Sequence, residues 1–118
     1  MQADPAALPR APRLRRNASD RLRDALQELA GGKARIASHS ETAWASVTFA
    51  GNRHRLEMLF DGEDGIAPGE AFIEALPDHE FAIPGQLVAD ATVSEVDHRL
   101  APKPRLAIAV ELLLLEDA

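Results

Sequence analysis

The sequence contains no cysteine, and this absence excludes several kinds of site at once. A chain without thiols forms no disulfide framework, offers no thiol nucleophile and binds no zinc or iron–sulfur cluster through cysteine. Long hydrophobic runs are also lacking. Leu106–Leu115 is interrupted by Glu111 and is far shorter than the ~20 apolar residues of a membrane helix. Arginines, not an apolar stretch, follow residues 6–8, so no secretory signal is recognised. We therefore expect a cytoplasmic protein that does not enter a membrane.

Positive charge is scarce outside the first residues of the chain. There are 13 Lys and Arg against 19 Asp and Glu, for a net charge of −6. Residues 1–16 hold four arginines against Asp4 and carry +3, which leaves −9 for the rest. Because nucleic-acid affinity rests mainly on Lys and Arg, this acidic body disfavours nucleic acid as a partner. An anionic partner for the arginine-rich segment alone remains an open alternative.

The same first segment contains Pro5, Pro9 and Pro12, which disfavour a helix. We predict a disordered basic leader over residues 1–18. Residues 19–118 are predicted to be a single α+β domain, since domains commonly have about 100–150 residues. The preference for arginine over lysine and the abundance of alanine fit a GC-rich bacterial genome.

A helix is predicted over residues 19–30. Leu22, Leu26 and Leu29 repeat at helical spacing and would face the core. Ser19 or Asn17 can cap the free backbone N–H groups of the first turn. The two glycines that follow would end the helix.

Beyond these glycines the hydrophobic period changes to two, which predicts a meander of three strands. The strands are expected over residues 34–39, 44–50 and 54–60. Gly51 and Asn52 are a two-residue turn signal between the second and third strands. One face of this hairpin is then largely apolar. The other face sets three pairs opposite each other: Trp44 and Leu59, Ser46 and Glu57, Thr48 and Arg55.

The second half of the chain predicts one more helix and two longer strands. An acidic loop is expected over residues 61–65, and a proline at the first position favours a helix over Pro68–Leu76. A short strand over 80–83 and strands over 87–97 and 105–115 follow. Both faces of the last strand are largely apolar, so we expect it to be central in the sheet or covered on both sides.

The predicted fold class is therefore α+β in two layers. We expect a mainly antiparallel sheet of about five to six strands with two helices on one face, in the order α-β-β-β-α-(β)-β-β. This order is similar to that of the bacterial secretion-chaperone fold, although the C-terminal helix of that family has no counterpart here. The resemblance implies a small sheet that dimerises and binds other proteins.

One surface of the meander carries an unusual mix of residues for a solvent face. A turn near residues 41–42 would bring His39 beside Trp44. Tryptophan offers a large apolar area and one hydrogen-bond donor, and Trp and Arg are enriched where interfaces carry their binding energy. The structural alternative is that Trp44 merely packs over Leu59 or under a loop. The candidate binding residues are Trp44, His39, Arg55, Leu59 and Glu57.

The remaining polar groups match no recognised chemical motif. The histidines lack the spacing of a metal site, and His54 faces the core side whereas His39 faces outward, so we expect them not to converge. The stretch over 61–65 lacks the ligand spacing of a calcium loop. The carboxylates between residues 90 and 97 have no companion nucleophile. We expect no metal and no cofactor, and no catalytic residue is assigned.

The leading hypothesis is a non-catalytic protein that binds another protein or its own copy, as a homodimer, through the face or edge of its sheet. The alternative is a small-molecule-binding or hydrolytic protein with a pocket between the sheet and the helices. Such a pocket would contain several polar groups with shifted pKa values. A third hypothesis, nucleic-acid binding through the leader, predicts an affinity that falls with salt.

Overall fold

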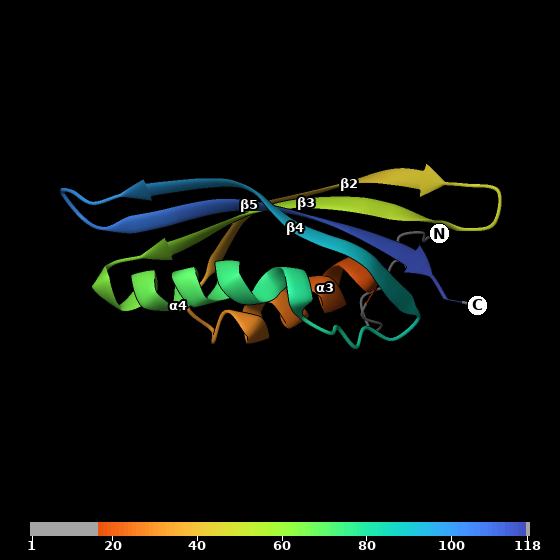
Figure 1. Cartoon of the computed structure of the whole chain (residues 1–118), viewed down its shortest axis with the longest axis horizontal. Helices are drawn as coiled ribbons and strands as arrows, with labels where there is room; N and C mark the ends of the chain where they lie inside the picture. Colours follow the sequence, from red (N-terminus) through yellow and green to blue (C-terminus); the bar gives the residue numbers. More distant parts are fainter. Residues whose placement is uncertain (1–16, 118) are drawn as a thin grey trace, which may run out of the picture.

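A computed structural model describes residues 17–117, which form two layers (Figure 1). One layer is a sheet of four strands in which all neighbours run antiparallel. The other layer consists of helices α3 (Ala18–Leu29) and α4 (Glu63–Ala75), which lie on the same face of the sheet. The predicted α+β class with two helices on one face is confirmed. We call the face toward the helices the inner face and the opposite one the outer face.

The sheet has fewer strands than predicted. Its strands are β2 (Arg35–Ala45), β3 (Ala50–Asp61), β4 (Gln86–Arg99) and β5 (Arg105–Glu116). β2 runs unbroken from the first predicted strand through the predicted turn near residues 41–42 to Ala45, so the second predicted strand, 44–50, does not exist as a separate strand. Residues 80–83 form no strand. The order across the sheet is β2-β3-β5-β4, so β2 and β4 are the edges and β5 lies inside, as its apolar faces predicted.

The hairpin between β2 and β3 turns at Ser46–Phe49 and not at Gly51. Ser46 donates its backbone N–H to the Phe49 carbonyl oxygen over 2.7 Å, and the Phe49 N–H donates to Ser46 Oγ over 3.1 Å. Gly51 lies inside β3, where a Cβ atom would overlap the carbonyl oxygen of Leu114 on β5. Glycine is required there by the close approach of two strands. In the sequence, however, Gly51 followed by Asn52 resembles a two-residue hairpin turn.

Helix α3 follows its prediction closely. Asn17 caps it: Asn17 Oδ1 accepts the Asp20 backbone N–H over 2.8 Å, and the Asp20 carboxylate accepts the Asn17 N–H in return. The acidic residue also suits the positive end of the helix dipole. Asn17 and Ala18, the last residues of the predicted leader, thus cap and begin the helix. Residues 1–16 of that leader lie outside the described residues.

Helix α4 begins five residues before its predicted start. Glu63 and Asp64, predicted to lie in an acidic loop, form its first turn, where carboxylates are favoured by the helix dipole. Gly62 leaves β3 with a φ of 79°, a conformation that suits glycine. A short 3₁₀ helix, Leu76–Asp78, follows α4.

The core lies between the sheet and the helices. Phe60 of β3 and Phe72 of α4 pack against each other in this core, with ring centroids 5.8 Å apart. Gly69 lets the helix approach closely, since a Cβ there would lie 2.7 Å from the Leu106 side chain. Among the described helices, none is long and apolar enough to cross a membrane. The largest fully buried side chains of the described residues are Leu22, Leu26, Leu56, Met58, Phe60, Phe72, Leu76, Leu106, Leu112, Leu114, His54 and Val110.

Candidate functional site

The outer face holds four of the five predicted site residues. Along β3 the buried side chains alternate with more exposed ones, so Arg55, Glu57 and Leu59 point away from the helices. Trp44 pairs with Gly51, which places it on the same outer face. His39 pairs with the buried Leu56 and therefore lies on the inner face. Because residues 39 and 44 belong to one strand and are separated by an odd number, they face opposite sides.

The predicted pairing of Trp44 with Leu59 is wrong. Leu59 pairs with Arg35, whereas Trp44 pairs with Gly51 at the other end of β3. Eight residues of strand separate these positions, a distance of about 26 Å at the usual rise per residue. Trp44 and Leu59 therefore cannot form one contact patch.

Arg55 ties three strands together at the middle of the outer face. Its guanidinium lies 3.1 Å from Glu111 Oε2 on β5 and 3.4 Å from Glu95 Oε2 on β4. It also donates to Ser94 Oγ over 3.3 Å, and that hydroxyl donates to the Ala109 carbonyl over 3.2 Å. Since its donors already meet two carboxylates, Arg55 is not poised to recognise an anionic ligand.

A shallow groove of about 460 Å³ lies beside this arginine on the outer face. Small and apolar residues, among them Leu59, Ala107 and Ala109, form its floor. Glu57, Glu95 and Asp97 line it as well and make it acidic. Glu95 is already bound by Arg55. Because no described helix covers this face of the sheet, the groove is open to solvent and is not an enclosed pocket.

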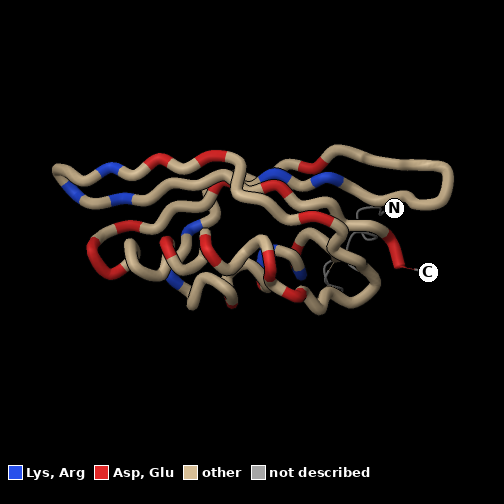
Figure 2. Tube along the Cα trace, viewed as in Figure 1, with Lys and Arg blue, Asp and Glu red and all other residues tan. Residues whose placement is uncertain are grey.

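The end of the β2–β3 hairpin differs from the rest of the surface. It extends past the helix layer (Figure 1), and residues 42–52 contain no charged side chain. This end of the trace is uniformly tan in Figure 2, whereas basic and acidic residues recur along the remainder. At the turn, Val47 is 103% exposed and Phe49 is 49% exposed. We call residues 42–52 the hairpin end.

An apolar row crosses the outer face at the hairpin end. The pairings place Trp44 next to Gly51, then Leu115, then Leu87 on the far edge. Leu115 is only 6% exposed although no described helix covers this face, while Leu87 is 52% exposed. Because Gly51 has no side chain, nothing from β3 stands between the indole of Trp44 and Leu115.

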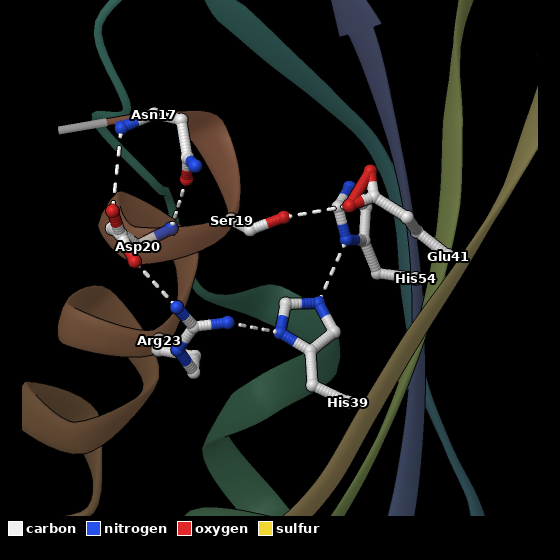
Figure 3. Close-up of polar contacts among 7 residues, drawn as sticks. All are labelled: Asn17, Ser19, Asp20, Arg23, His39, Glu41 and His54. Carbon is white, nitrogen blue, oxygen red and sulfur yellow. Dashed lines mark hydrogen bonds and ion pairs between the residues drawn. The ribbon is translucent and has the colours of Figure 1, made fainter. Parts of the chain in front are cut away.

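Beneath the sheet, a chain of polar contacts joins α3 to β2 and β3 (Figure 3). Asp20, held by the cap of α3, binds the guanidinium of Arg23. Arg23 Nη1 lies 2.7 Å from His39 Nδ1, and His39 Nε2 lies 2.9 Å from His54 Nδ1. The prediction that these two histidines do not converge is therefore wrong. We call Arg23, His39 and His54 the histidine chain.

The arginine fixes the direction of every hydrogen bond in the histidine chain. A guanidinium only donates, so His39 Nδ1 must accept and the ring's single proton must sit on Nε2. That N–H donates to Nδ1 of His54, which must carry its own proton on Nε2. Both imidazoles are therefore neutral in this arrangement. A further proton on either Nδ1 atom would set one N–H against another and break the chain.

The surroundings of the two rings favour this neutral state. Burial lowers the pKa of His39, and the nearby His54 and Arg23 lower it further. Burial also lowers the pKa of His54, whose side chain is 1% exposed, against an opposing effect of Glu41. Glu41 faces His54 across the strands and accepts a hydrogen bond from Ser19 Oγ over 2.8 Å, which ties α3 to β2 a second time.

The two histidines of the chain lie away from the outer groove and from a second hollow. His54 is buried, and neither ring lines the outer groove or the open hollow beside α3, which Arg21, Asp24 and Pro84 help to form. Among residues 17–117, no group of three or more His, Asp or Glu side chains is arranged to hold a metal ion. Through the contacts of Arg23 with His39 and of His39 with His54, the histidine chain fastens α3 to the sheet.

Comparison with known proteins adds nothing to this description. No family model, curated protein or solved structure significantly matches the chain. Any function must therefore be argued from the arrangement of its own residues. The distinctive surface is the hairpin end with the adjoining edge of β2. Sequence reasoning selected Trp44 there but missed its neighbours, although the absence of charge over 42–52 was a visible signal.

Proposed function

We propose that the protein is a non-catalytic binding module that associates with its own copies through the hairpin end. The observation that carries this proposal is an uncharged strand pair that projects past the helices and leaves Trp44, Val47 and Phe49 partly or wholly exposed. Exposed apolar surface gathered in one place marks an interaction site, whereas scattered apolar residues do not.

Net charge supports the choice of this surface over others. The residues outside the leader carry −9 in total, so two copies repel each other over most of their surfaces. The hairpin end is the part of the sheet where two acidic bodies can approach with little repulsion. Tryptophan also supplies large apolar area at little cost in side-chain entropy, which favours it in interfaces.

The alternative of a pocket between sheet and helices receives no comparable support. The outer groove lies on the far side of the sheet from the helices, and the hollow beside α3 opens between that helix and the 82–84 segment. Side chains from both layers fill the space between them. One proposal is therefore advanced.

Molar mass in solution tests it directly. Light scattering after size exclusion, over a wide range of protein concentration, should show a mass that rises above that of one chain. Trp44→Ala should shift this rise to higher concentration while the circular dichroism spectrum stays unchanged. Leu100→Ala is the matched control, since Leu100 is an apolar residue, 73% exposed, in the loop between β4 and β5. A single-chain mass at every concentration would refute the proposal.

A further inference from the structure

The open edge of β2 defines how a second copy could attach. β2 is hydrogen-bonded to β3 on one side only. Ser46 donates its backbone N–H to Phe49 across the hairpin, so residues 40, 42 and 44 direct their backbone groups toward β3. The alternate residues 39, 41, 43 and 45 therefore present N–H and C=O groups to the open side. These groups are a template for another strand.

The two edges of the sheet differ in how well they are protected. β4 contains two register shifts, at Val88/Asp90 and Val93/Glu95, and carries further charge beyond them. Bulges and charges are the devices by which edge strands avoid pairing. β2 has one shift, at Ile36/Ser38, and from residue 38 to 45 its pairing with β3 is continuous. That segment contains no proline, and Glu41 is its only formal charge.

We infer that a second copy of this chain adds to the sheet at β2, with the two β2 strands antiparallel and related by a two-fold axis at Thr42. This inference rests on the proposed function, because it specifies how the self-association occurs. A two-fold contact uses the same surface on both partners, and each copy brings one regular open edge. The product is one continuous sheet across both copies.

The register follows from pattern and charge. Residues directly opposite each other must share a face, so the axis passes through a residue and not between two. Within the regular segment 38–45, an axis at Glu41 or at Thr42 sets seven residues of one copy opposite seven of the other, and an axis at any other residue pairs fewer. An axis at Glu41 would set two carboxylates opposite each other, which destabilises a strand pair. An axis at Thr42 places Glu41 opposite Ala43 and pairs the two threonines, a favourable combination.

The same register fits the helix layer. Helix α3 lies under His39, to which Arg23 is bonded. Opposite His39 and Glu41 stand Ala45 and Ala43 of the second copy, whose side chains are small. They belong to the hairpin end, which projects past its own helices (Figure 1). The second copy therefore places only small side chains opposite the two residues that α3 contacts. Trp44 comes to lie opposite Ser40 of the second copy, at the contact.

A cysteine scan in this cysteine-free chain tests the register. Thr42 would face its own copy in a non-hydrogen-bonded pair with Cα atoms about 4.5 Å apart, a separation that suits a disulfide. Ser40 is the matched control, since it is likewise exposed on the outer face of β2. Two Ser40 residues would lie about 13 Å apart along the strands. Under mild oxidation, Thr42→Cys should give covalent dimer much faster than Ser40→Cys. Equal rates, or the reverse order, would overturn the inference.

A second pair of variants checks the edge itself without a cross-link. Ala43→Pro removes a backbone N–H that points to the open side and should return the protein to single chains, whereas Ala43→Val keeps that N–H and should still associate. Association that survives Ala43→Pro but is lost in Trp44→Ala would reject the edge pairing and leave the proposed function standing. A wild-type protein that stays single at all concentrations would reject both.

Discussion

Arg23 and Arg55 each connect one element of the protein to others, and their settings differ in one respect that matters. The side chains of Arg23 and Arg55 are almost equally exposed, 36% and 37%. Arg55 meets carboxylates on the outer face, of which Glu95 is 71% exposed. Arg23 donates into a pair of neutral imidazoles that ends at His54, 1% exposed.

The comparison shows that the burial of the partners, and not of the arginine, sets the consequence. An exposed ion pair is screened by water and contributes little. A buried polar group that loses its partner cannot turn to water, so the full cost of desolvation remains. We therefore expect the histidine chain to control stability and its pH dependence, and the Arg55 contacts to contribute only modestly. Four experiments test this contrast.

The largest effect should come from the buried end of the histidine chain. His54→Ala leaves a cavity and removes the acceptor of the His39 N–H, and each of these changes is costly. We expect a loss of about 2–4 kcal/mol in the free energy of unfolding. Urea denaturation followed by the fluorescence of the single tryptophan measures it. A loss no greater than that of Arg55→Met would contradict the contrast.

Acid should destabilise the protein through the same chain. The pKa values of His39 and His54 are lowered in the folded state, so the unfolded chain binds protons first. Stability is then complete above pH 6.5, the ordinary histidine value, and falls below it until the folded-state pKa values are passed. The slope contributed by His54 is at most about 1.4 kcal/mol per pH unit, and His39 contributes less because solvent screens it.

The control for this prediction uses a histidine outside the chain. His39→Asn combined with His54→Asn should flatten the stability profile between neutral and mildly acidic pH, whereas His98→Asn should leave its shape unchanged. Asp20, Arg23 and Glu41 are the charged groups that face the two rings, and none of them is altered in these variants. An unchanged slope in the double variant would show that the histidine chain is not the sensor.

Substitution of the outer arginine should have a smaller effect. Arg55→Met removes contacts with Glu95 and Glu111 but keeps the aliphatic stem over the sheet. We expect a loss of about 0.2–1 kcal/mol, which should shrink further in high salt. Denaturation with urea at two salt concentrations measures both effects. A salt-independent loss would mean that these ion pairs are less accessible to solvent than their exposure indicates.

The smallest effect should appear at one end of the outer face. A hydrogen bond from Arg105, helped by Arg35, lowers the pKa of Asp61. Its contribution is therefore present above pH 3.8, the ordinary aspartate value, and is lost as the pH falls below it. Asp61→Asn should therefore lower stability slightly at neutral pH and abolish the further loss that the natural protein shows below pH 3.8. A change at neutral pH as large as that of Arg55→Met would show that Asp61 acts by other means.

Local sequence signals predicted part of the molecule well. Leu22 and Leu26 face the core as their spacing indicated, Asn17 caps α3, and the two last strands fall within two residues of their predicted ends. The turn of the first hairpin was misassigned because Gly51 serves close strand packing. Glu63 and Asp64 suggested a loop, since a sequence does not reveal which acidic residues will begin a helix.

The candidate site depended on these same errors. Dividing β2 into two strands placed His39 beside Trp44, although one strand puts them on opposite faces. The misplaced turn then moved Trp44 by about 26 Å relative to Leu59. The meeting of His39 with His54 requires the correct register and also Arg23 from a helix that lies sixteen residues away in the chain.

The sequence by itself determined the class of the fold, the capped first helix, the apolar interior strand and an uncharged segment over residues 42–52. These features are local: periodicity, caps and charge are read from neighbouring residues. Tertiary structure alone decided the register of β2 on β3, the neutral histidine chain and which edge of the sheet is open. Each of these depends on contacts between distant segments, where a shift of a few residues along a strand changes every partner.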